Sequence, residues 1–578
     1  MDLKTTPSSS QKTLVYLVCG VLVFLYLFLQ YYYISPYPFG DDLPSIYRFL
    51  LEVQQADSFG EKLKLIFTNG FVEHKLLFFS LFITSLYGLI GKISLPLFAL
   101  GAGVVWCSIF FFYKYWLPFI RVSSYWLVAI ALVLLSFAPY QAIFWTMAAL
   151  QHFSVTFLCF LTIYLLCKPA KHNLTFFLLA TLSGFFCTYS SGNGMAVWPA
   201  GFLALALQRE IKFALGWLLS SAAGIGSYLY SIALNETPSG SKLSHVFEAL
   251  STKIVNFIAG LAGASYFKND SLDFSDGEPP LSFTYFSIYL GFLLLVLFLL
   301  GFIQAYRKQN RGLIAVISVS AFIVITFAFV AFGRASSQEL FVIFKSRYYT
   351  YSVIAIANGL FCLAYLSREF RYQKAVLYVG MAYSVFFWGC WLFNSYTNLL
   401  NQRNILDLGY LNFTKTGQWI CYQPTFFYER FYNTFFSEHQ DKLVQLPTTD
   451  LHTAFQNKQV TDAVFSPCSN VRMQVMHNKP GFVNMRLYNG EAPAIHNRKE
   501  GYAIAMVSQQ DTFLLYTTLL RNSVKKLLTT GQPTRKGYTL DIQLRQNSFP
   551  KGSYELHQFY FKNKEGFYNP RNEGTITL

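Results

Sequence analysis

The sequence predicts an all-α, multi-pass membrane domain followed by a soluble, β-rich domain. Apolar residues make up 53% of the 578 residues and charged residues only 13%, about half the charged fraction of soluble domains. Residues 1–397 consist largely of apolar runs long enough to cross about 30 Å of hydrocarbon as helices. From residue 398 onward no run is long enough to span a membrane, and about the last ninety residues alternate apolar and polar side chains.

Apolar runs in residues 1–397 predict helices, because unpaired backbone groups cannot face lipid. The first run covers Leu14 to about Tyr33, and no small-residue cleavage site follows it. We therefore expect a retained anchor helix rather than a removed signal peptide. The further candidate spans are about 76–91, 94–113, 122–139, 151–168, 173–188, 193–208, 213–232, 282–305, 312–333, 350–366 and 375–395.

Basic residues between these spans indicate which loops face the cytoplasm. The net charge is +16, but no recognition motif accompanies it, so nucleic acid is not expected as a partner. Lys and Arg instead cluster in short loops at 168–171, 307–311 and 368–374, as the positive-inside rule describes. Twelve spans and a cytoplasmic N-terminus would put these clusters outside. We therefore expect 11 or 13 spans, with the tail outside. One span between residues 76 and 168 is then miscounted, because either two spans are read as one or a stretch such as 141–150 is re-entrant.

Two polar loops interrupt the predicted membrane domain. Residues 34–75 carry amphipathic patterns at Leu43–Leu51 and Leu63–Phe71, which predict two helices on the membrane surface. Residues 235–281 form a second long loop with no apolar run that could span.

The tail, residues 398–578, is predicted to be an extracytoplasmic domain with a small β-sandwich at its end. The chain has nine cysteines and no CxxC pair, so no cysteine metal framework is expected. Cys421 and Cys468 lie in the tail and either form one disulfide, in an oxidising compartment, or stay unpaired.

The adjacent carboxylates Asp41 and Asp42 follow the first span. Ionisable groups at a membrane boundary are costly and mark functional sites. A cation or a shared proton would relieve the repulsion of the pair, and an ionised carboxylate near a hydroxyl is what a general base requires. Alternatively, Asp42 only caps a helix that begins at Leu43-Pro44.

Glu73 and His74 stand at the entrance to the next predicted span. Together with Asp41 and Asp42 they offer oxygen and imidazole ligands for a divalent cation, Mg²⁺ or Mn²⁺. The alternative is an ordinary polar helix entry in which the Lys75 side chain reaches toward the head groups.

A third group of candidates lies between two late spans: Arg334, Lys345 and Arg347. The planar guanidinium of Arg suits phosphate oxygens and stays charged. Binding of membrane lipid head groups is the alternative. The weaker candidates are Trp145, Gln151, His152, Asn193 and His245. No P-loop, GxGxxG, HExxH or GxSxG motif is present, so no nucleotide cofactor is expected.

The strings FGDD…EHK and GR…SRY…YS resemble motifs of the GT-C glycosyltransferases, in particular an uncharacterised bacterial branch. The resemblance covers about residues 14–397 and excludes the tail. It implies that Asp41 is the catalytic base and that Asp42 assists a metal or orients the acceptor. It also implies that Glu73 and His74 lie near the metal or acceptor, and that Arg334 and Arg347 hold the donor phosphate.

The resemblance further implies a function in the bacterial inner membrane. The protein would transfer a monosaccharide from a polyprenyl-phosphate carrier to a cell-surface glycan, lipid or protein. Two alternatives stay open: a transporter or flippase of lipid-linked sugars, and a glycan polymerase or ligase that uses a polyprenyl-diphosphate carrier. A transporter would show inverted repeats with interrupted helices in matching halves, and no such repeat is visible in the sequence.

Overall fold

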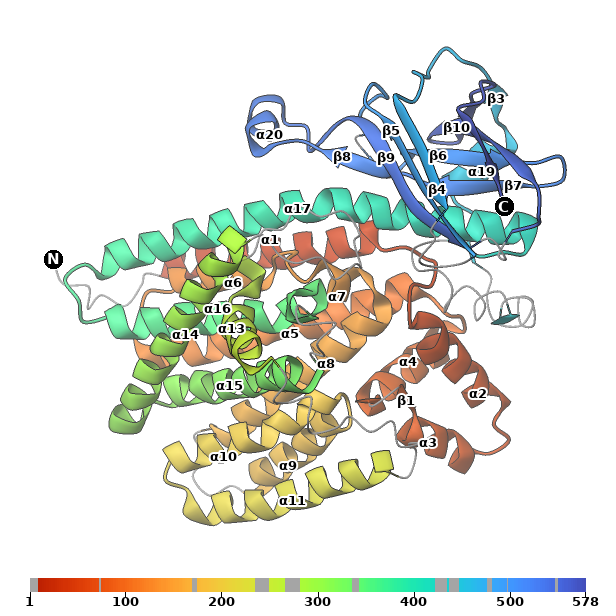
Figure 1. Cartoon of the computed structure of the whole chain (residues 1–578). Coiled ribbons are helices and arrows are strands. Elements are labelled where there is room, and N and C mark those ends of the chain that lie inside the picture. The colour runs from red at the N-terminus through yellow and green to blue at the C-terminus, as the bar shows by residue number, and fades with distance from the viewer. Residues whose placement is uncertain are drawn as a thin grey trace.

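The computed structural model shows a helical bundle joined to a C-terminal β-rich domain (Figure 1). The structure describes residues 9–71, 74–168, 174–233, 249–265, 281–334, 342–420, 434–435, 446–475, 481–495, 497–545 and 549–578. It is mostly helical, as predicted, and seven of its helices are long and apolar enough to cross a membrane. The fold is therefore compatible with a multi-pass membrane protein.

The bundle is built from helices that run between its two ends. They are α1 (Ser9–Tyr33), α5 (Leu95–Ile120), α6 (Tyr125–Leu134), α7 (Tyr140–Phe144), α8 (Thr146–Leu166), α9 (Leu174–Thr188), η2 (Gly192–Ala196), α10 (Val197–Leu207), α11 (Ile211–Ala233), α14 (Leu281–Lys308), α15 (Arg311–Ala328), η4 (Phe329–Arg334), η5 (Val342–Phe344), η6 (Ser346–Tyr348), α16 (Tyr349–Ser367) and α17 (Gln373–Thr416).

Hydrogen bonds show which helix ends lie together. We call the end of the bundle where α1 finishes the tail end, and the opposite end the N-terminal end. At the tail end, Asp42 accepts a hydrogen bond from the start of α8, and Thr146 of α8 donates to the carbonyl of Leu95 at the start of α5. At the N-terminal end, Asn310 beside α15 donates to the carbonyl of Phe119, near the end of α5.

The short helix α4 (Leu77–Ile90) corrects the expected span at 76–91. Its first residue, Leu77, donates a backbone hydrogen bond to Tyr189 after α9, at the tail end, and α5 then begins at that same end. Helix α4 therefore does not cross the bundle. The stretch at 141–150 falls in α7 and the start of α8, and the alternative that it is re-entrant stays a prediction.

Seven of the described helices are long and apolar enough to span a membrane: α1, α5, α8, α14, α15, α16 and α17. The expected total of 11 or 13 spans stays a prediction, because α6, α9 and α10 are shorter apolar helices. In Figure 1 the start of α1 and the C-terminal domain lie toward opposite ends of the bundle.

The basic loops gather at one end. Lys168 follows α8, Arg307 and Arg311 flank the turn from α14 to α15, and Arg368 and Lys374 flank the turn from α16 to α17. All three positions lie at the N-terminal end of the bundle. The charge pattern and the path of the chain therefore agree with each other.

The first polar loop is helical, as predicted, but its second helix ends at Thr68 instead of Phe71. The loop contains η1 (Leu43–Arg48), α2 (Phe49–Gln55) and α3 (Phe59–Thr68), and then a hairpin of the two-residue strands β1 (Gly70–Phe71) and β2 (His74–Lys75). Leu43, Ile46 and Leu50 are buried in the protein, so the apolar face of the first helix does not lie on the membrane surface as expected. Ser58 caps α3 by accepting a hydrogen bond from the N–H of Glu61. In the second loop, the described part is α13 (Leu250–Leu261) with η3 (Gly263–Ser265).

The C-terminal domain is a sandwich of two sheets packed face to face. One sheet has the order β3-β11-β10-β6-β7, with β12 also pairing with β10, and the other has the order β4-β5-β9-β8. Inward residues such as Met485, Ile504 and Leu540 fill the space between them. The strands are β3 (Gln459–Val460), β4 (Asn470–Val475), β5 (Phe482–Asn489), β6 (Glu500–Val507), β7 (Thr512–Tyr516), β8 (Thr518–Arg521), β9 (Thr534–Arg545), β10 (Ser553–Lys562), β11 (Glu565–Tyr568) and β12 (Gly574–Thr577), with helices α19 (Asp450–Gln456) and α20 (Val524–Thr530).

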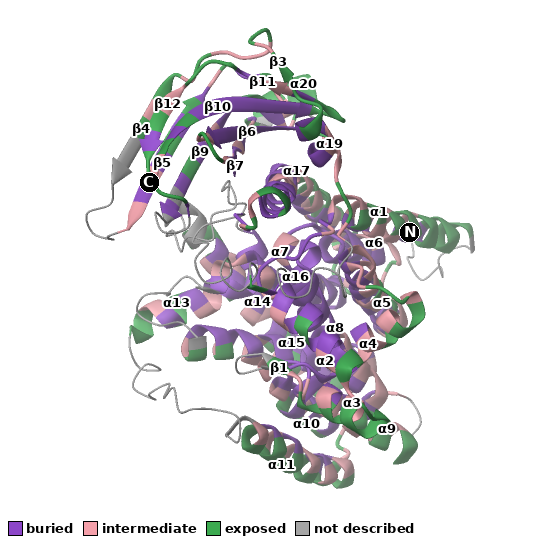
Figure 2. Cartoon of the chain, turned by 90° about the vertical axis from the view of Figure 1, so that its right-hand side faces the viewer, coloured by how far each residue is buried: buried purple, intermediate pink, exposed green. Residues whose placement is uncertain are grey.

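Helix α17 joins the two domains without a break. The expected boundary at 397/398 falls inside this 44-residue helix. The second face of the β6-containing sheet packs on the end of α17, where Leu408 and Leu411 meet Ala503, Ala505 and Phe559. Figure 2 shows this buried layer between α17 and strands β6, β7 and β10.

Asparagines on α17 complete the junction. Asn412 both accepts from the N–H and donates to the carbonyl of Leu514 on β7, at 2.7 and 2.8 Å. Asn401 accepts from the N–H of Leu519 at 3.0 Å. Arg521 donates to Asn394 and Asn398 at 2.8 to 3.0 Å. These bonds fix the sandwich to the helix that enters the bundle.

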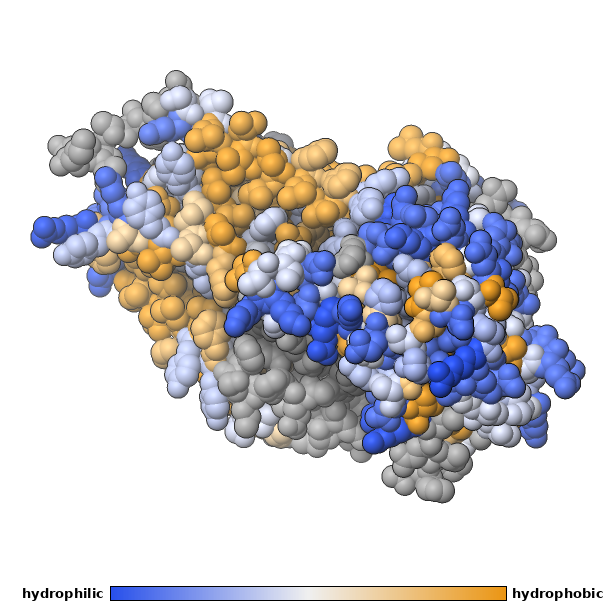
Figure 3. Space-filling view, turned by 90° about the horizontal axis from the view of Figure 1, so that it is seen from above, coloured by the Kyte–Doolittle hydropathy of each residue, from blue (hydrophilic) through white to orange (hydrophobic). Residues whose placement is uncertain are grey.

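The surface differs between the two domains. In the view of Figure 3, apolar side chains gather over the bundle and hydrophilic ones over the sandwich. Large exposed apolar residues lie on α1, for example Leu17 and Phe24, and on α14, for example Tyr289 and Phe292. An apolar surface of this kind suits contact with lipid.

Candidate functional site

The acidic pair lies at the tail end, in the turn between α1 and η1. Gly40 adopts a φ of +52°, and a Cβ there would meet the ring of Trp145 at 3.0 Å. The ring of Phe39 packs edge-on against the same Trp145, with 5.5 Å between centroids. The turn is thereby pressed against the segment that connects α7 to α8.

The two carboxyl groups of the pair have different surroundings. Asp42 is 1% exposed, and its Oδ2 and Oδ1 accept hydrogen bonds from the N–H groups of Phe39 at 3.0 Å and Met147 at 2.7 Å. Asp41 is only half-buried. Asp42 therefore fastens the loop to the first turn of α8.

The alternative interpretation expected Asp42 to cap the helix that follows it, and this expectation is wrong. Its side chain makes no capping hydrogen bond to η1 and serves α8 instead. Burial raises the pKa of the Asp42 carboxyl to about 8, against the opposing effect of the two N–H donors, and the neighbouring Asp41 raises it further. At neutral pH the Asp42 carboxyl is therefore largely protonated.

Replacement of Asp42 by Ala is expected to lower stability. It leaves the buried N–H groups of Phe39 and Met147 without partners, and each such loss costs about 1–3 kcal/mol. Asp42→Asn retains one acceptor and is neutral like the protonated carboxyl, so its cost should be smaller. Thermal unfolding of the purified variants in detergent measures this order. Equal melting temperatures for Ala and Asn would contradict the assignment.

The same pKa predicts a dependence of stability on pH. Because the folded-state pKa of Asp42 lies above its unfolded value, the contribution of this group is fully present below about pH 4 and is lost as the pH rises toward 8. The Asn variant should lack this part of the pH dependence.

The predicted basic residues Lys345 and Arg347 lie in a segment that is also hydrogen-bonded to the region around α7. Ser346 of η6 donates to the carbonyl of Ala138 at 3.0 Å and accepts from the N–H of Gln141 at 3.3 Å. Both Lys345 and Arg347 flank Ser346 and are half-buried. The residues from Ala138 to Met147, which we call the connector, are therefore hydrogen-bonded to Asp42 of the acidic pair and to Ser346, the residue between the two basic residues.

Arg347 has no carboxylate partner among the described residues, and its guanidinium lies 5.3 Å from the ring centroid of Tyr348. Arg334 ends η4, at the tail end of α15, and its side chain is outside the described residues. The structure thus brings Lys345 and Arg347 to the region of the acidic pair and leaves Arg334 as a prediction.

Lys75 is a functional candidate that the sequence interpretation treated only as a boundary lysine. It lies in the β1–β2 hairpin, paired with Gly70, and is 7% exposed. No described residue forms an ion pair with it, and burial lowers the pKa of its ammonium group. A buried ammonium group is costly unless an anion lies beside it. Glu73 lies outside the described residues, and His74 is described only in its backbone.

A buried polar cluster completes the site. Nδ1 of His152 lies 2.9 Å from the hydroxyl of Tyr351, which accepts a hydrogen bond from Asn193 at 2.8 Å. Gln151 donates to Ser191 at 3.1 Å. The ring of His152 also packs edge-on against Tyr348, the neighbour of Arg347. Gln151, His152 and Asn193, three of the weaker candidates from the sequence, thus lie close together beside η6.

The predicted metal site fits the described residues poorly. Both oxygens of Asp42 accept backbone hydrogen bonds, and its raised pKa keeps the carboxyl largely protonated. A metal ligand must be deprotonated. Asp42 therefore does not fit the role of a Mg²⁺ or Mn²⁺ ligand, and the mechanism below contains no metal step. Cys421 lies outside the described residues, so its disulfide with Cys468 stays a prediction.

Comparison with protein families, curated proteins and solved structures finds no match to this chain. The functional assignment therefore rests on the geometry of this site and on the resemblance of the short motifs to the GT-C glycosyltransferases.

Proposed function

We propose that this protein is an integral-membrane glycosyltransferase that moves a monosaccharide from a polyprenyl-phosphate carrier to a cell-surface glycan, lipid or protein. The observation that carries the proposal is the convergence at the connector. The loop that carries Asp41 and the segment that carries Lys345 and Arg347 are about 300 residues apart in the sequence, and both are hydrogen-bonded to the same ten-residue stretch at one end of the bundle, through Asp42 and through Ser346.

The chemistry needs a base and an anion site. The acceptor hydroxyl attacks the anomeric carbon of the donor, and Asp41 takes its proton. A bond forms from the acceptor oxygen to the anomeric carbon, and the bond from that carbon to the phosphate oxygen breaks. The electron pair leaves with the polyprenyl phosphate, whose charge Lys75 and Arg347 neutralise. A phosphate leaving group needs no nucleotide.

The proposed surroundings agree with a lipid-linked donor. The site lies at the tail end of a bundle with an apolar surface, where the phosphate of a carrier would stand at the head-group level while its chain lies in the bilayer. We place the protein in the bacterial inner membrane with the tail end facing the periplasm, because the basic loops lie at the opposite end.

This orientation is tested with reporter fusions. A reporter active only in the periplasm should be active when fused after Leu578 and inactive when fused after Lys168, since the basic loops and the tail lie at opposite ends of the bundle. The reverse pattern would place the tail in the cytoplasm and remove the donor-phosphate assignment. A fusion after Arg371 is the matched control, because it should behave like the fusion after Lys168.

A polymerase or ligase that uses a diphosphate carrier is the second candidate. Three cations, Lys75, Lys345 and Arg347, lie at the tail end, and this number would also suit two phosphates. A transporter is less favoured, because its charges would line a path through the bundle, whereas these lie at the ends of helices.

The assay that tests the function uses membranes from cells that express the protein. They receive radiolabelled polyprenyl-phosphate sugars of several kinds, and polyprenyl-diphosphate sugars in parallel. Label should pass from one monophosphate donor to a glycan or lipid product, and not in membranes without the protein. Transfer only from diphosphate donors would favour the second candidate, and transfer from neither would contradict both.

A further inference from the structure

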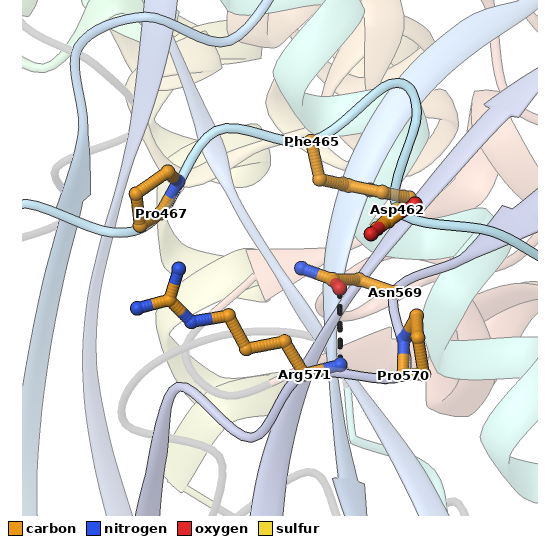
Figure 4. A pocket seen from close by; sticks show the side chains of 6 residues that line it. All are labelled: Asp462, Phe465, Pro467, Asn569, Pro570 and Arg571. Atoms are coloured by element: carbon orange, nitrogen blue, oxygen red, sulfur yellow. Dashed lines mark hydrogen bonds between the residues drawn. The ribbon is translucent and has the colours of Figure 1, made fainter.

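The sandwich domain carries a depression that the transfer chemistry does not use. It has a volume of about 380 Å³ and lies between the segment that follows β3 and the turn between β11 and β12. Figure 4 shows the Asp462 carboxylate toward one side and the Arg571 guanidinium toward the other, with Phe465 between them along the upper edge. The lining residues are Asp462, Phe465, Pro467, Asn569, Pro570 and Arg571.

The charged groups of the depression are available to a ligand. Neither Asp462 nor Arg571 forms an ion pair or a side-chain hydrogen bond with a described residue, and both are exposed. Asn569 forms the floor, and its Oδ1 accepts a hydrogen bond from the N–H of Arg571 at 3.0 Å.

Buried polar groups hold the two sides of the depression together. Gln558, 1% exposed, donates to the carbonyl of Ser466 at 2.8 Å and to Glu573 at 2.7 Å. Glu573 also accepts from the N–H of Cys468 at 3.0 Å. Ser466 and Cys468 belong to the first side, and Glu573 to the second. A buried network of this kind fixes loops in place, as preformed binding sites require.

Further bonds anchor the network in the sandwich core. Asn489, fully buried, donates to the Ser466 carbonyl and to Gln558, both at 2.9 Å. The hydroxyl of Tyr538 donates to Gln558 at 2.6 Å. The loops that form the depression are therefore tied to β5, β9 and β10.

We propose that this depression binds a sugar unit of a glycan. A sugar ring presents apolar C–H faces and a rim of hydroxyl groups. The ring of Phe465 and the two prolines offer apolar surface for such a face. Asp462 accepts from hydroxyl groups, and Arg571 donates to hydroxyl or carboxylate oxygens. The identification of this glycan with the acceptor rests on the proposed function, but the binding itself does not.

Binding is tested on the full-length protein in detergent. The probe is an array of immobilised oligosaccharides built from neutral hexoses, N-acetylhexosamines and uronic acids. Wild type should be retained by a subset of these glycans. Phe465→Ala and Arg571→Ala should each lower retention about tenfold or more, because each removes one contact to the sugar. Arg486→Ala is the matched control, because this arginine is also exposed on the sandwich and forms an ion pair with Asp541 at 2.9 Å.

The outcomes separate this inference from the transfer reaction. The base variant Asp41→Asn should bind the array like wild type, since the depression lies in the other domain. Retention lost in both pocket variants and kept in Arg486→Ala supports the glycan site. No retention of wild type by any glycan, or equal retention of wild type and both pocket variants, overturns it, whether or not the protein transfers sugar.

Discussion

Replacement of Asp41 by Asn is expected to lower sugar transfer by about two to four powers of ten, the usual contribution of a general base. Asn has the shape of Asp but cannot take the proton of the acceptor hydroxyl. Asp41 is only half-buried, and it is the neighbouring Asp42 that accepts the hydrogen bonds from the N–H groups of Phe39 and Met147 and so fastens the loop. Folding should therefore change little.

The measurement is the initial rate of label transfer by purified protein, with thermal unfolding as the check on folding. Asp57→Asn serves as the matched control, because Asp57 is an exposed carboxylate in the same loop. Its rate should equal that of wild type. A well-folded Asp41→Asn protein with wild-type rate would remove Asp41 from the role of base.

Replacement of Arg347 by Ala is expected to have the second largest effect. The guanidinium has no carboxylate partner among the described residues, so its loss removes a contact to the carrier phosphate rather than an internal ion pair. A hydrogen bond to a charged group contributes about 1.5–3 kcal/mol, so kcat/KM for the donor should fall roughly tenfold to a hundredfold. KM for the acceptor should change less. Lys at this position should restore only part of the loss, because it lacks the planar fork.

Donor and acceptor saturation curves measure this split. Arg48→Ala is the control, since Arg48 lies in the first loop and forms an exposed ion pair with Glu52 at 2.9 Å. Unchanged kinetic constants for the donor in Arg347→Ala would exclude this residue from the phosphate site. Lys75→Met, which keeps the length of the side chain without its charge, should resemble Arg347→Ala if both cations hold the same phosphate.

The fold was predictable where one property of the local sequence decides it. Long apolar runs become helices of the bundle, the amphipathic pattern at Leu43–Leu51 becomes helical, and the pattern at Leu63–Phe71 is helical as far as Thr68. The alternation near the end becomes the sandwich. Helix α4 was predicted to be a span because hydropathy shows that a segment is apolar, but does not show whether protein or lipid surrounds it. Phe79 and Ile83 of α4 are fully buried in the protein, and Gly101 of α5 lies against Phe82.

The domain boundary was missed for a related reason. The composition changes at about residue 398, but α17 continues to Thr416, because its asparagines bind strand backbones rather than water. A polar residue on a helix looks the same in sequence whether it faces solvent or the edge of a sheet. Only the folded sandwich shows the difference.

The site was predictable in residue type and not in role. The residues Asp41, Asp42, Lys345 and Arg347 were recognisable as charges at the ends of spans. The role of each residue depends on contacts with residues distant in sequence, such as the contact of Asp42 with Met147, 105 residues away. The meeting of His152 with Tyr351 joins residues 199 positions apart. Lys75 was taken for a boundary lysine because its burial arises from the hairpin and the bundle around it.

The most direct test of the proposed function follows both halves of the donor. Purified protein in vesicles receives a polyprenyl-phosphate sugar with ³H in the sugar and ¹⁴C in the polyprenyl chain, together with cell-envelope acceptors. A glycosyltransferase breaks the bond between the anomeric carbon and the phosphate, so ³H should leave the lipid while ¹⁴C appears as free polyprenyl phosphate, and Asp41→Asn should show neither. If the two labels stay together and only change membrane leaflet, the protein moves lipid-linked sugars and the proposed transfer reaction is wrong.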